Sequence, residues 1–200
     1  QPASYDYGFI DIALDSVFGN VYKNSNSGAS LNSFPNGMQL FGNELFITAQ
    51  GTFGQPGSIY KINSATNQLI SSQPSIGNNP YSFTFANGNI YITNTGSNFV
   101  KVVDMNFNSV IDSISVGFNP ADILFAGGNI FVAKQSYAKE KSLAVINPNN
   151  QVSKIFFQGA PVSIALNSGK VYVSTYSYKK VFVIDASSAQ VTDSIDMPIT

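Results

Sequence analysis

The chain has 200 residues, of which 44% are hydrophobic and 10% are charged. This length and composition support one sizeable core and exclude both a disordered tail and a small disulfide-stapled protein. The ten cations are all lysines and are balanced by eleven acids, so the chain lacks the basic field that binds nucleic acid or an anionic membrane. The absence of Cys, His and Trp excludes thiol nucleophiles, imidazole bases and most zinc, copper and haem ligation by side chains.

The start of the chain carries no targeting pattern. Gln1-Pro2-Ala3-Ser4 lacks the basic start and apolar middle of an export signal. No apolar run in the sequence reaches the roughly eighteen residues of a membrane span. We therefore expect a chain that begins in its mature form, or that was made to begin at this residue, and that does not insert into a membrane.

Residues 8–34 carry the strand pattern of only half of a repeating unit. One strand is predicted at 8–13, a turn at 14–16 and a second strand at 17–22. We expect an outer hairpin whose two inner partner strands are not encoded at the other end of the chain. This hairpin is the N-terminal half blade of the architecture predicted below.

From residue 35 onward the chain contains four copies of one layout. Each copy begins with a proline, passes through a short apolar strand, turns at a Gly/Asn pair and enters a strand rich in aromatic and β-branched residues. The first copy differs mainly by a longer middle loop. The copies cover residues 35–79, 80–119, 120–160 and 161–200, so they start 40 to 45 residues apart.

Four antiparallel strands are clearest in the second copy, where Asn87-Gly88 supplies the positive φ of a tight hairpin. Four short strands repeated about every forty residues are typical of a β-propeller blade, and no copy holds the 3.6-residue apolar pattern of a helical solenoid. The sequence therefore predicts an all-β chain, a single β-propeller domain over 1–200 with four full four-stranded antiparallel blades and one N-terminal half blade. The second copy's strands are predicted at 82–86, 90–94, 99–104 and 110–116.

Two copies carry a recognisable motif. The second contains Tyr91-Ile92-Thr93-Asn94, then Val-Lys-Val-Val-Asp at 100–104 and Asp-Ser-Ile-Ser-Val-Gly-Phe-Asn-Pro at 112–120, and the fourth contains Tyr172-Val173-Ser174-Thr175 followed by Val-Phe-Val-Ile-Asp at 181–185. These residues resemble the bacterial YVTN-repeat family of surface-layer-like propellers. The resemblance implies propeller architecture and a secreted, extracellular or periplasmic, cell-surface-associated protein, and it implies no particular activity. The other two copies are degenerate, with Phe46-Ile47-Thr48-Ala49 and Phe131-Val132-Ala133-Lys134.

The number of blades leaves two alternatives open. Members of the resembled family usually close with seven blades, whereas this sequence encodes four and a half. Either part of a longer ring is absent, or a second chain completes it. An open ring exposes strand edges and an apolar blade face, so we expect self-association through the incomplete blade into an oligomer.

Loops between the second and third strands of each copy carry the candidate binding residues. Propellers commonly bind ligands on the face that these loops share, and aromatic rings beside polar groups stack on sugars or on peptide side chains. The alternative interpretation is that these tyrosines pack their loops against their own blade. The candidates are Phe53, Tyr137, Lys139, Tyr176, Tyr178 and Lys179.

Acidic and Gly-rich positions give no catalytic, metal or cofactor site. Asp104 and Asp185 end their strands at a turn, where a carboxylate accepts backbone N–H groups. No EF-hand pattern occurs, and the Gly-rich segment 51–57 lacks the Gly-Lys-Ser/Thr ending of a phosphate loop.

These observations predict a non-catalytic secreted or cell-surface propeller that acts as a binding and assembly module for a protein or a cell-surface glycan. The alternative is a Ca²⁺-dependent propeller enzyme of the lactonase type. Lactonase chemistry needs a general acid or base, or an activated water near a cation. With neither His nor Arg, and with Glu44 and Glu140 as its two glutamates, the chain offers few such groups.

Overall fold

The computed structural model describes residues 5–52, 55–135 and 140–198. It contains eighteen β-strands and one short helix, and no helix in the described part of the chain is long and apolar enough to cross a membrane. The chain divides into two compact units, residues 1–80 and 81–200, which are taken in turn.

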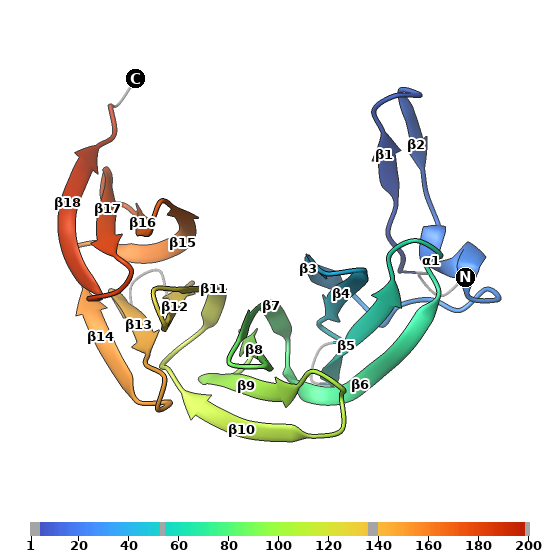
Figure 1. Cartoon of the computed structure of the whole chain (residues 1–200). Helices are drawn as coiled ribbons and strands as arrows, with labels where there is room; N and C mark the ends of the chain where they lie inside the picture. Colours follow the sequence, from blue (N-terminus) through green and yellow to red (C-terminus); the bar gives the residue numbers. More distant parts are fainter. Residues whose placement is uncertain (1–4, 53–54, 136–139, 199–200) are drawn as a thin grey trace. The chain divides into compact units, whose positions relative to one another are not determined.

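The first unit contains one four-stranded antiparallel sheet, which we call blade 1, preceded by a hairpin and a helix (Figure 1). The turn at 42–43 joins the first two strands of blade 1. It places Gly42 at a φ of 59°, a conformation that glycine adopts without strain. The elements are β1 (Phe9–Asp11), β2 (Ser16–Phe18), α1 (Val21–Ser25), β3 (Pro35–Phe41), β4 (Glu44–Ala49), β5 (Pro56–Asn63) and β6 (Leu69–Asn78).

Three further four-stranded antiparallel sheets form the second unit, each with its strands paired in chain order (Figure 1). Blade 2 comprises β7 (Pro80–Ala86), β8 (Asn89–Asn94), β9 (Phe99–Asp104) and β10 (Val110–Ser115). Blade 3 comprises β11 (Pro120–Ala126), β12 (Asn129–Lys134), β13 (Ser142–Ile146) and β14 (Val152–Phe156). Blade 4 comprises β15 (Ala160–Asn167), β16 (Lys170–Tyr176), β17 (Lys180–Asp185) and β18 (Gln190–Asp196).

The predicted fold class is confirmed. Each of the four copies forms one four-stranded antiparallel sheet, and the strands predicted for the second copy lie within two residues of β7 to β10. The Asn87-Gly88 pair sits in the hairpin turn with φ angles of 51° and 73°. The apolar and turn patterns therefore identified the four strands of this copy.

Blades of the second unit pack face to face. In blades 2 and 3, we call the side that meets the next blade in the chain the following face, and the opposite side the leading face. In blades 1 and 4 the two faces are named from the residues that occupy the same columns by strand register. Alternate residues of each strand share one face, so every blade contributes one set of apolar side chains to each junction. Burying one Val, Leu or Ile side chain stabilises the fold by roughly 1.5–3 kcal/mol. The blade 2–blade 3 junction contains Tyr91, Val100, Val102, Ile114, Val116, Ile123, Ile130, Val132, Ala144 and Ile146; the blade 3–blade 4 junction contains Phe131, Leu143, Val145, Ile164, Val171, Val173 and Ile184.

The N-terminal segment corrects one prediction. The strand expected at 17–22 ends at Phe18, and the chain then enters α1 through Asn20, whose φ is 54°. The Asp6 carboxylate accepts the backbone N–H groups of Tyr22 and Lys23 at 2.9 and 2.8 Å and so stabilises the start of the helix. Tyr22 becomes almost fully buried. The apolar pair at 21–22 was wrongly assigned to a strand because it forms the buried face of this short helix.

This helix helps to cover the leading face of blade 1. Tyr22 and Leu31 form a buried cluster with Ile47 and Ile62 of the sheet, and Tyr60 packs against the same cluster. The predicted half blade at 8–34 is therefore a hairpin over 9–18 followed by a segment that packs on blade 1.

Candidate interaction surface

The following face of blade 4 repeats the composition of a face that is buried inside the second unit. Strand register places six of its residues in the columns that six residues of blade 2 occupy. The chemistry of each pair is the same or nearly so, and the blade 2 members face blade 3. The pairs are Tyr172 with Tyr91, Ser174 with Thr93, Val181 with Val100, Val183 with Val102, Asp193 with Asp112, and Ile195 with Ile114.

Burial separates the two faces. Tyr91 and Ile114 of blade 2 are 3% and 6% exposed because blade 3 covers them. In blade 4 the exposed fraction of Ile195 is 47%, and Tyr172 is only half-buried. Blade 4 therefore presents a junction-type surface whose outer residue Ile195 is much more exposed than its blade 2 counterpart, although Val183 is 4% exposed against 2% for Val102. An exposed apolar face of this kind is typical of an interaction site.

Polar groups on the two faces differ in the same way. In blade 2 the Tyr91 hydroxyl donates to Asn150 Oδ1 at 3.3 Å, and Asn150 Nδ2 donates to the Asp112 carboxylate at 3.0 Å. Asn150 belongs to the turn between the two outer strands of blade 3. No such bond to the hydroxyl of Tyr172, the blade 4 counterpart of Tyr91, is present in the described part of the chain. The hydroxyl is thus available to a turn supplied by a partner.

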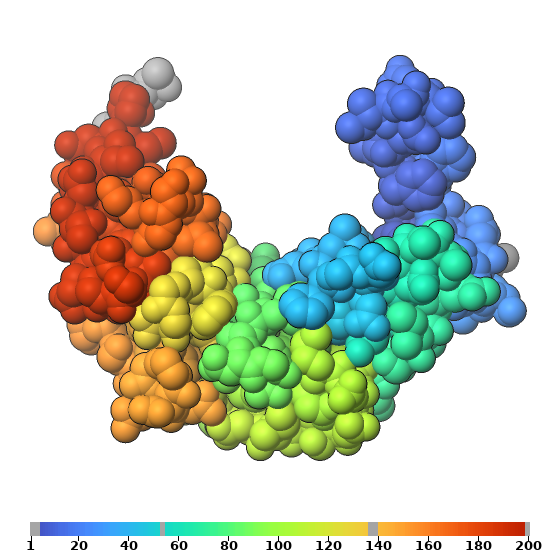
Figure 2. Space-filling view, viewed as in Figure 1, coloured from blue at the N-terminus to red at the C-terminus, as the bar shows by residue number. Residues whose placement is uncertain are grey.

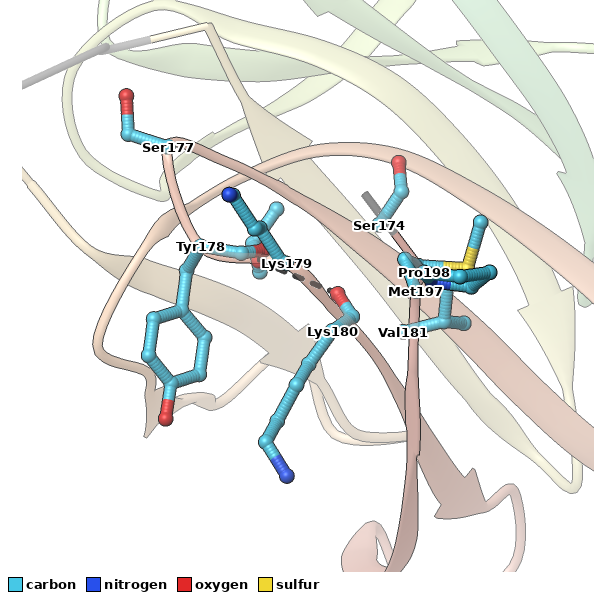
Figure 3. Close-up of a pocket in the computed structure, with 9 residues that line it drawn as sticks. Ser174, Ser177, Tyr178, Lys179, Lys180, Val181, Met197 and Pro198 are labelled. Carbon is cyan, nitrogen blue, oxygen red and sulfur yellow. Dashed lines mark hydrogen bonds between the residues drawn. The ribbon is translucent and has the colours of Figure 1, made fainter. Parts of the chain in front are cut away.

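A hollow of about 490 Å³ lies at the loop end of this face (Figure 3). The loop from β16 to β17 forms one wall and is held in a tight conformation: Thr175 Oγ1 donates to the carbonyl of Tyr178 at 2.8 Å, and the Met197 N–H donates to the carbonyl of Lys179 at 2.9 Å. The side chains of Tyr178 and Lys180 extend in the same direction from the loop in Figure 3. The lining residues are Ser174, Thr175, Ser177, Tyr178, Lys179, Lys180, Val181, Met197 and Pro198.

Two lysines give the rim of the hollow its charge. The Lys180 ammonium forms an ion pair with Asp196 at 2.9 Å, and this hydrogen bond raises the lysine pKa. Lys179 is exposed and makes no ion pair with residues in the described ranges 5–52, 55–135 and 140–198. Lys179 is therefore the cation at this rim that remains available to an anionic group.

Side chains of the next blade occupy the corresponding place in blade 2. Lys134 of blade 3 donates to the Val116 carbonyl at 3.3 Å, and Glu140 accepts the Phe118 N–H at 3.2 Å. Glu140 also pairs with Lys134 at 2.8 Å and with Lys154 at 2.6 Å. The loop end of an interior blade is thus completed by its neighbour, and the hollow beside Met197 is the matching position in blade 4.

The pKa values of Glu140 and Lys134 are both shifted in this cluster. Burial opposes the charge on Glu140, but hydrogen bonds from the two lysines outweigh it and lower the Glu140 pKa to about 2. Burial lowers the pKa of Lys134, although Glu140 counteracts the shift. The Lys134 side chain is fully buried, so its ammonium depends on the carboxylate for compensation.

Tyr178 also takes part in the junction between blades 3 and 4. Its ring is nearly parallel to that of Phe182, with centroids 6.1 Å apart, and Phe182 contacts Phe157 with centroids 4.7 Å apart. A Cβ atom added to Gly159 would lie 2.7 Å from Tyr178 Cβ, so the loop closely approaches the connection between blades 3 and 4. A second hollow of about 410 Å³ borders this junction and is lined by Phe156, Phe157, Gln158, Tyr178, Lys180, Phe182 and Ser194.

Of the six binding candidates, the structure brings two together. Tyr178 and Lys179 line the first hollow, whereas Tyr176 is the last residue of β16, is exposed and does not line it. Phe53, Tyr137 and Lys139 lie outside the described residues. Selection of loop aromatics missed the strand residues of the face, Tyr172, Val181 and Ile195, and Met197 directly after β18, which an alignment of the repeats by strand register would have found.

The acidic turn residues behave as predicted. Asp104 accepts the backbone N–H groups of Asn106 and Ser109 at 2.9 and 2.7 Å. Hydrogen bonds from Ser187 and Ser188 lower the pKa of Asp185 to about 2. No group of three or more metal-ligating side chains gathers within the described residues.

Comparisons with known proteins give the fold more clearly than the activity. The most informative solved structures are a hydrazine synthase of Kuenenia stuttgartiensis (19% identity, TM-score 0.70, covering 85% of this chain and 52% of that one) and apo AztD of Citrobacter koseri (14%, 0.61, 84% and 48%). The dihydro-heme d1 dehydrogenase NirN in complex with DHE is also similar (11%, 0.63, 84% and 37%). This chain spans about half the length of the first two, and these likenesses establish a propeller-like fold. No curated protein matches the chain, and one family model matches residues 7–200.

Proposed function

The chain belongs to the family described as a domain of unknown function (DUF5074), and we propose that it is a non-catalytic binding and assembly module that recruits a polypeptide to the following face of blade 4. The observation that supports this proposal most directly is the six-column match to the buried face of blade 2. We further propose a secreted or cell-surface location, in line with the YVTN resemblance.

The partner must present a face like the one that covers blade 2. Branched aliphatic side chains such as Ile123 and Val132 supply that face within the chain. Thr93 of blade 2 donates its hydroxyl to the carbonyl of Ala121 at 2.5 Å, and Ser174 occupies the same column in blade 4. The bound partner therefore combines apolar packing with a backbone carbonyl near Ser174, as the edge of a β-sheet provides.

Photo-crosslinking tests the face directly. With benzoylphenylalanine at position 195 in cells that express the chain, we expect a discrete adduct whose second component can be identified by mass spectrometry. The matched control is position 111, because Ile111 is also an exposed isoleucine on an outermost strand. Equal labelling at both positions, or no adduct at position 195, would contradict the proposal.

The non-catalytic part of the proposal has its own measurement. The rival function is Ca²⁺-dependent hydrolysis of a lactone. Assays on lactones, esters and sugar substrates, with and without Ca²⁺, should give no turnover above background. Metal-dependent turnover that is carried by the purified chain would favour the enzyme instead.

A glycan is the second candidate ligand, favoured by the hollow of about 410 Å³. Its lining combines the aromatic rings of Phe156 and Tyr178 with the polar groups of Lys180, Gln158 and Ser194, which suits a sugar face and its hydroxyls.

On a glycan array, Phe156→Ala should abolish any specific hit, because Phe156 is exposed and its loss leaves the core intact. Tyr176→Ala serves as the control, since Tyr176 is an exposed aromatic residue at the end of β16 and lies outside this hollow. A hit that survives Phe156→Ala and disappears with Tyr176→Ala would place the ligand elsewhere.

A further inference from the structure

The β1–β2 hairpin exposes apolar side chains on both of its faces. Phe9 pairs with Phe18 and Ile10 with Val17, so each face carries one apolar cross-strand pair. The exposed fractions of Ile12 and Val17 are 91% and 78%. The hairpin projects from the remainder of the first unit in the space-filling view (Figure 2). A ribbon of two strands is marginally stable in water, and exposed apolar surface of this kind is a docking element.

The base of the hairpin is anchored to the rest of the first unit, whereas Ile10, Ile12 and Val17 are exposed. The Val21 N–H donates to the Tyr7 carbonyl at 3.1 Å, and the Tyr7 hydroxyl donates to Asn67 Oδ1 at 3.0 Å. At the tip, the Asp11 carboxylate accepts the N–H groups of Ala13 and Leu14. Stacked rings of Phe9 and Phe18, with centroids 4.8 Å apart, add rigidity. The hairpin is therefore preorganised for binding, which reduces the entropy lost on association.

Inside the second unit, an outer hairpin of the next blade covers the outer half of a following face. The pair β13–β14 places Ala144, Ile146 and Val152 against the cluster that contains Val100 and Ile114 of blade 2. The hairpin β1–β2 has the same antiparallel two-stranded form and the same kind of branched side chains. Blade 4 carries Val181 and Ile195 in the columns of Val100 and Ile114.

We propose that the β1–β2 hairpin of one copy docks on the outer strands of blade 4 of a second copy. This inference rests on the proposed function and names the partner at the same face. Two copies that exchange hairpins make two equal contacts about a two-fold axis, which is the commonest oligomer symmetry and doubles the buried area. A net charge of −1 per chain produces little repulsion between copies.

Charge on the hairpin and on blade 4 is compatible with this arrangement. Asp11 and Asp15 lie at the hairpin tip, and Lys170 begins β16 at the turn end of the following face. In the interior junctions it is the turn between the outer strands that reaches this end, as Asn150 does toward Tyr91. The tip acids would approach Lys170 and the Tyr172 hydroxyl of the second copy.

Cysteine cross-linking tests the contact without background, because the chain contains no cysteine. Equal amounts of Val17→Cys and Ile195→Cys chains are mixed and treated with a short bismaleimide. We expect a covalent product that contains one chain of each kind. The matched control replaces Ile195→Cys by Ile111→Cys and should give no product above random collision. Circular dichroism of each variant verifies that the strands are retained.

Two results would overturn the inference. One is the absence of the mixed product together with a monomeric mass of the unmodified chain in light scattering. The other is a Val17→Cys/Ile195→Cys double variant that cross-links within a single chain and remains monomeric, because the hairpin would then close on its own blade 4. In either case an adduct at position 195 with a different polypeptide would still support the proposed function. The absence of any adduct at position 195 would contradict both this inference and the proposed function.

Discussion

Replacing Glu140 by glutamine will lower the free energy of unfolding by about 3 kcal/mol, the cost of leaving a buried charge without its partner. Lys134 is fully buried, and its ammonium lies 2.8 Å from the Glu140 carboxylate. The same carboxylate binds Lys154 at 2.6 Å and the Phe118 N–H at 3.2 Å, so one side chain links blades 2 and 3. Urea unfolding at neutral pH measures the change.

The pH dependence of the unfolding free energy is an independent test of the Glu140–Lys134 ion pair. Since the Glu140 pKa is about 2 in the folded chain, below the ordinary glutamate value of 4.5, its contribution to stability is present above pH 4.5 and is lost as the pH falls toward 2. Unfolding free energies measured between these values should decline less steeply in Glu140→Gln than in the unmodified chain. Equal slopes in the two proteins would contradict this account.

Lys134→Met is the matched control for Glu140→Gln. It removes the buried ammonium and leaves Glu140 paired with Lys154, so no isolated buried charge remains. We expect it to cost less than half as much as Glu140→Gln. A larger loss in Lys134→Met would mean that the lysine stabilises the junction chiefly by its own hydrogen bonds to Val116 and Ser142.

Truncation of two aligned aromatic residues will have very different effects. Phe131→Ala removes a fully buried ring between blades 3 and 4 and should cost about 3–5 kcal/mol through lost packing and a cavity. Tyr172 occupies the same column in blade 4 and is half-buried. Tyr172→Ala should therefore cost only about 1 kcal/mol in dilute solution.

The concentration dependence of the Tyr172→Ala effect shows whether a second copy covers blade 4. If a second copy covers blade 4, the cost of Tyr172→Ala rises with protein concentration, because binding to the folded state adds stability by mass action. The cost of Phe131→Ala stays the same over that range. Thermal unfolding at several concentrations makes the comparison, and a constant difference for both variants would count against self-association.

Sequence alone located the strands because their apolar alternation is local. The turn at Asn87-Gly88 and the alternation in β8 and β9 needed no long-range information. The assignment failed at 21–22, where two apolar residues serve one short helix that is stabilised by Asp6, a residue distant in sequence. Local periodicity cannot distinguish a short helix from a strand at that length.

The interaction surface was less predictable for a different reason. Loop aromatics such as Tyr178 stand out by residue type, whereas Val181 and Ile195 resemble any other strand residue. Their significance comes from incomplete burial at columns that are buried in blade 2, and burial depends on which blade covers which. The repeat sequences show which residues lie on each face, but they do not show which blade packs against that face.

Face-to-face packing also determines how the second unit opens. Each blade is stabilised by its own sheet and by the faces it shares with adjacent blades, so stability is distributed as in a one-dimensional array with nearest-neighbour coupling. In that unit blade 3 shares both of its faces, while blade 4 has the junction with blade 3 on one side and exposed Ile195 and Met197 on the other. At this end of the second unit, local unfolding therefore begins at blade 4, and a partner that binds its following face acts as an end cap that stabilises blade 4 against unfolding.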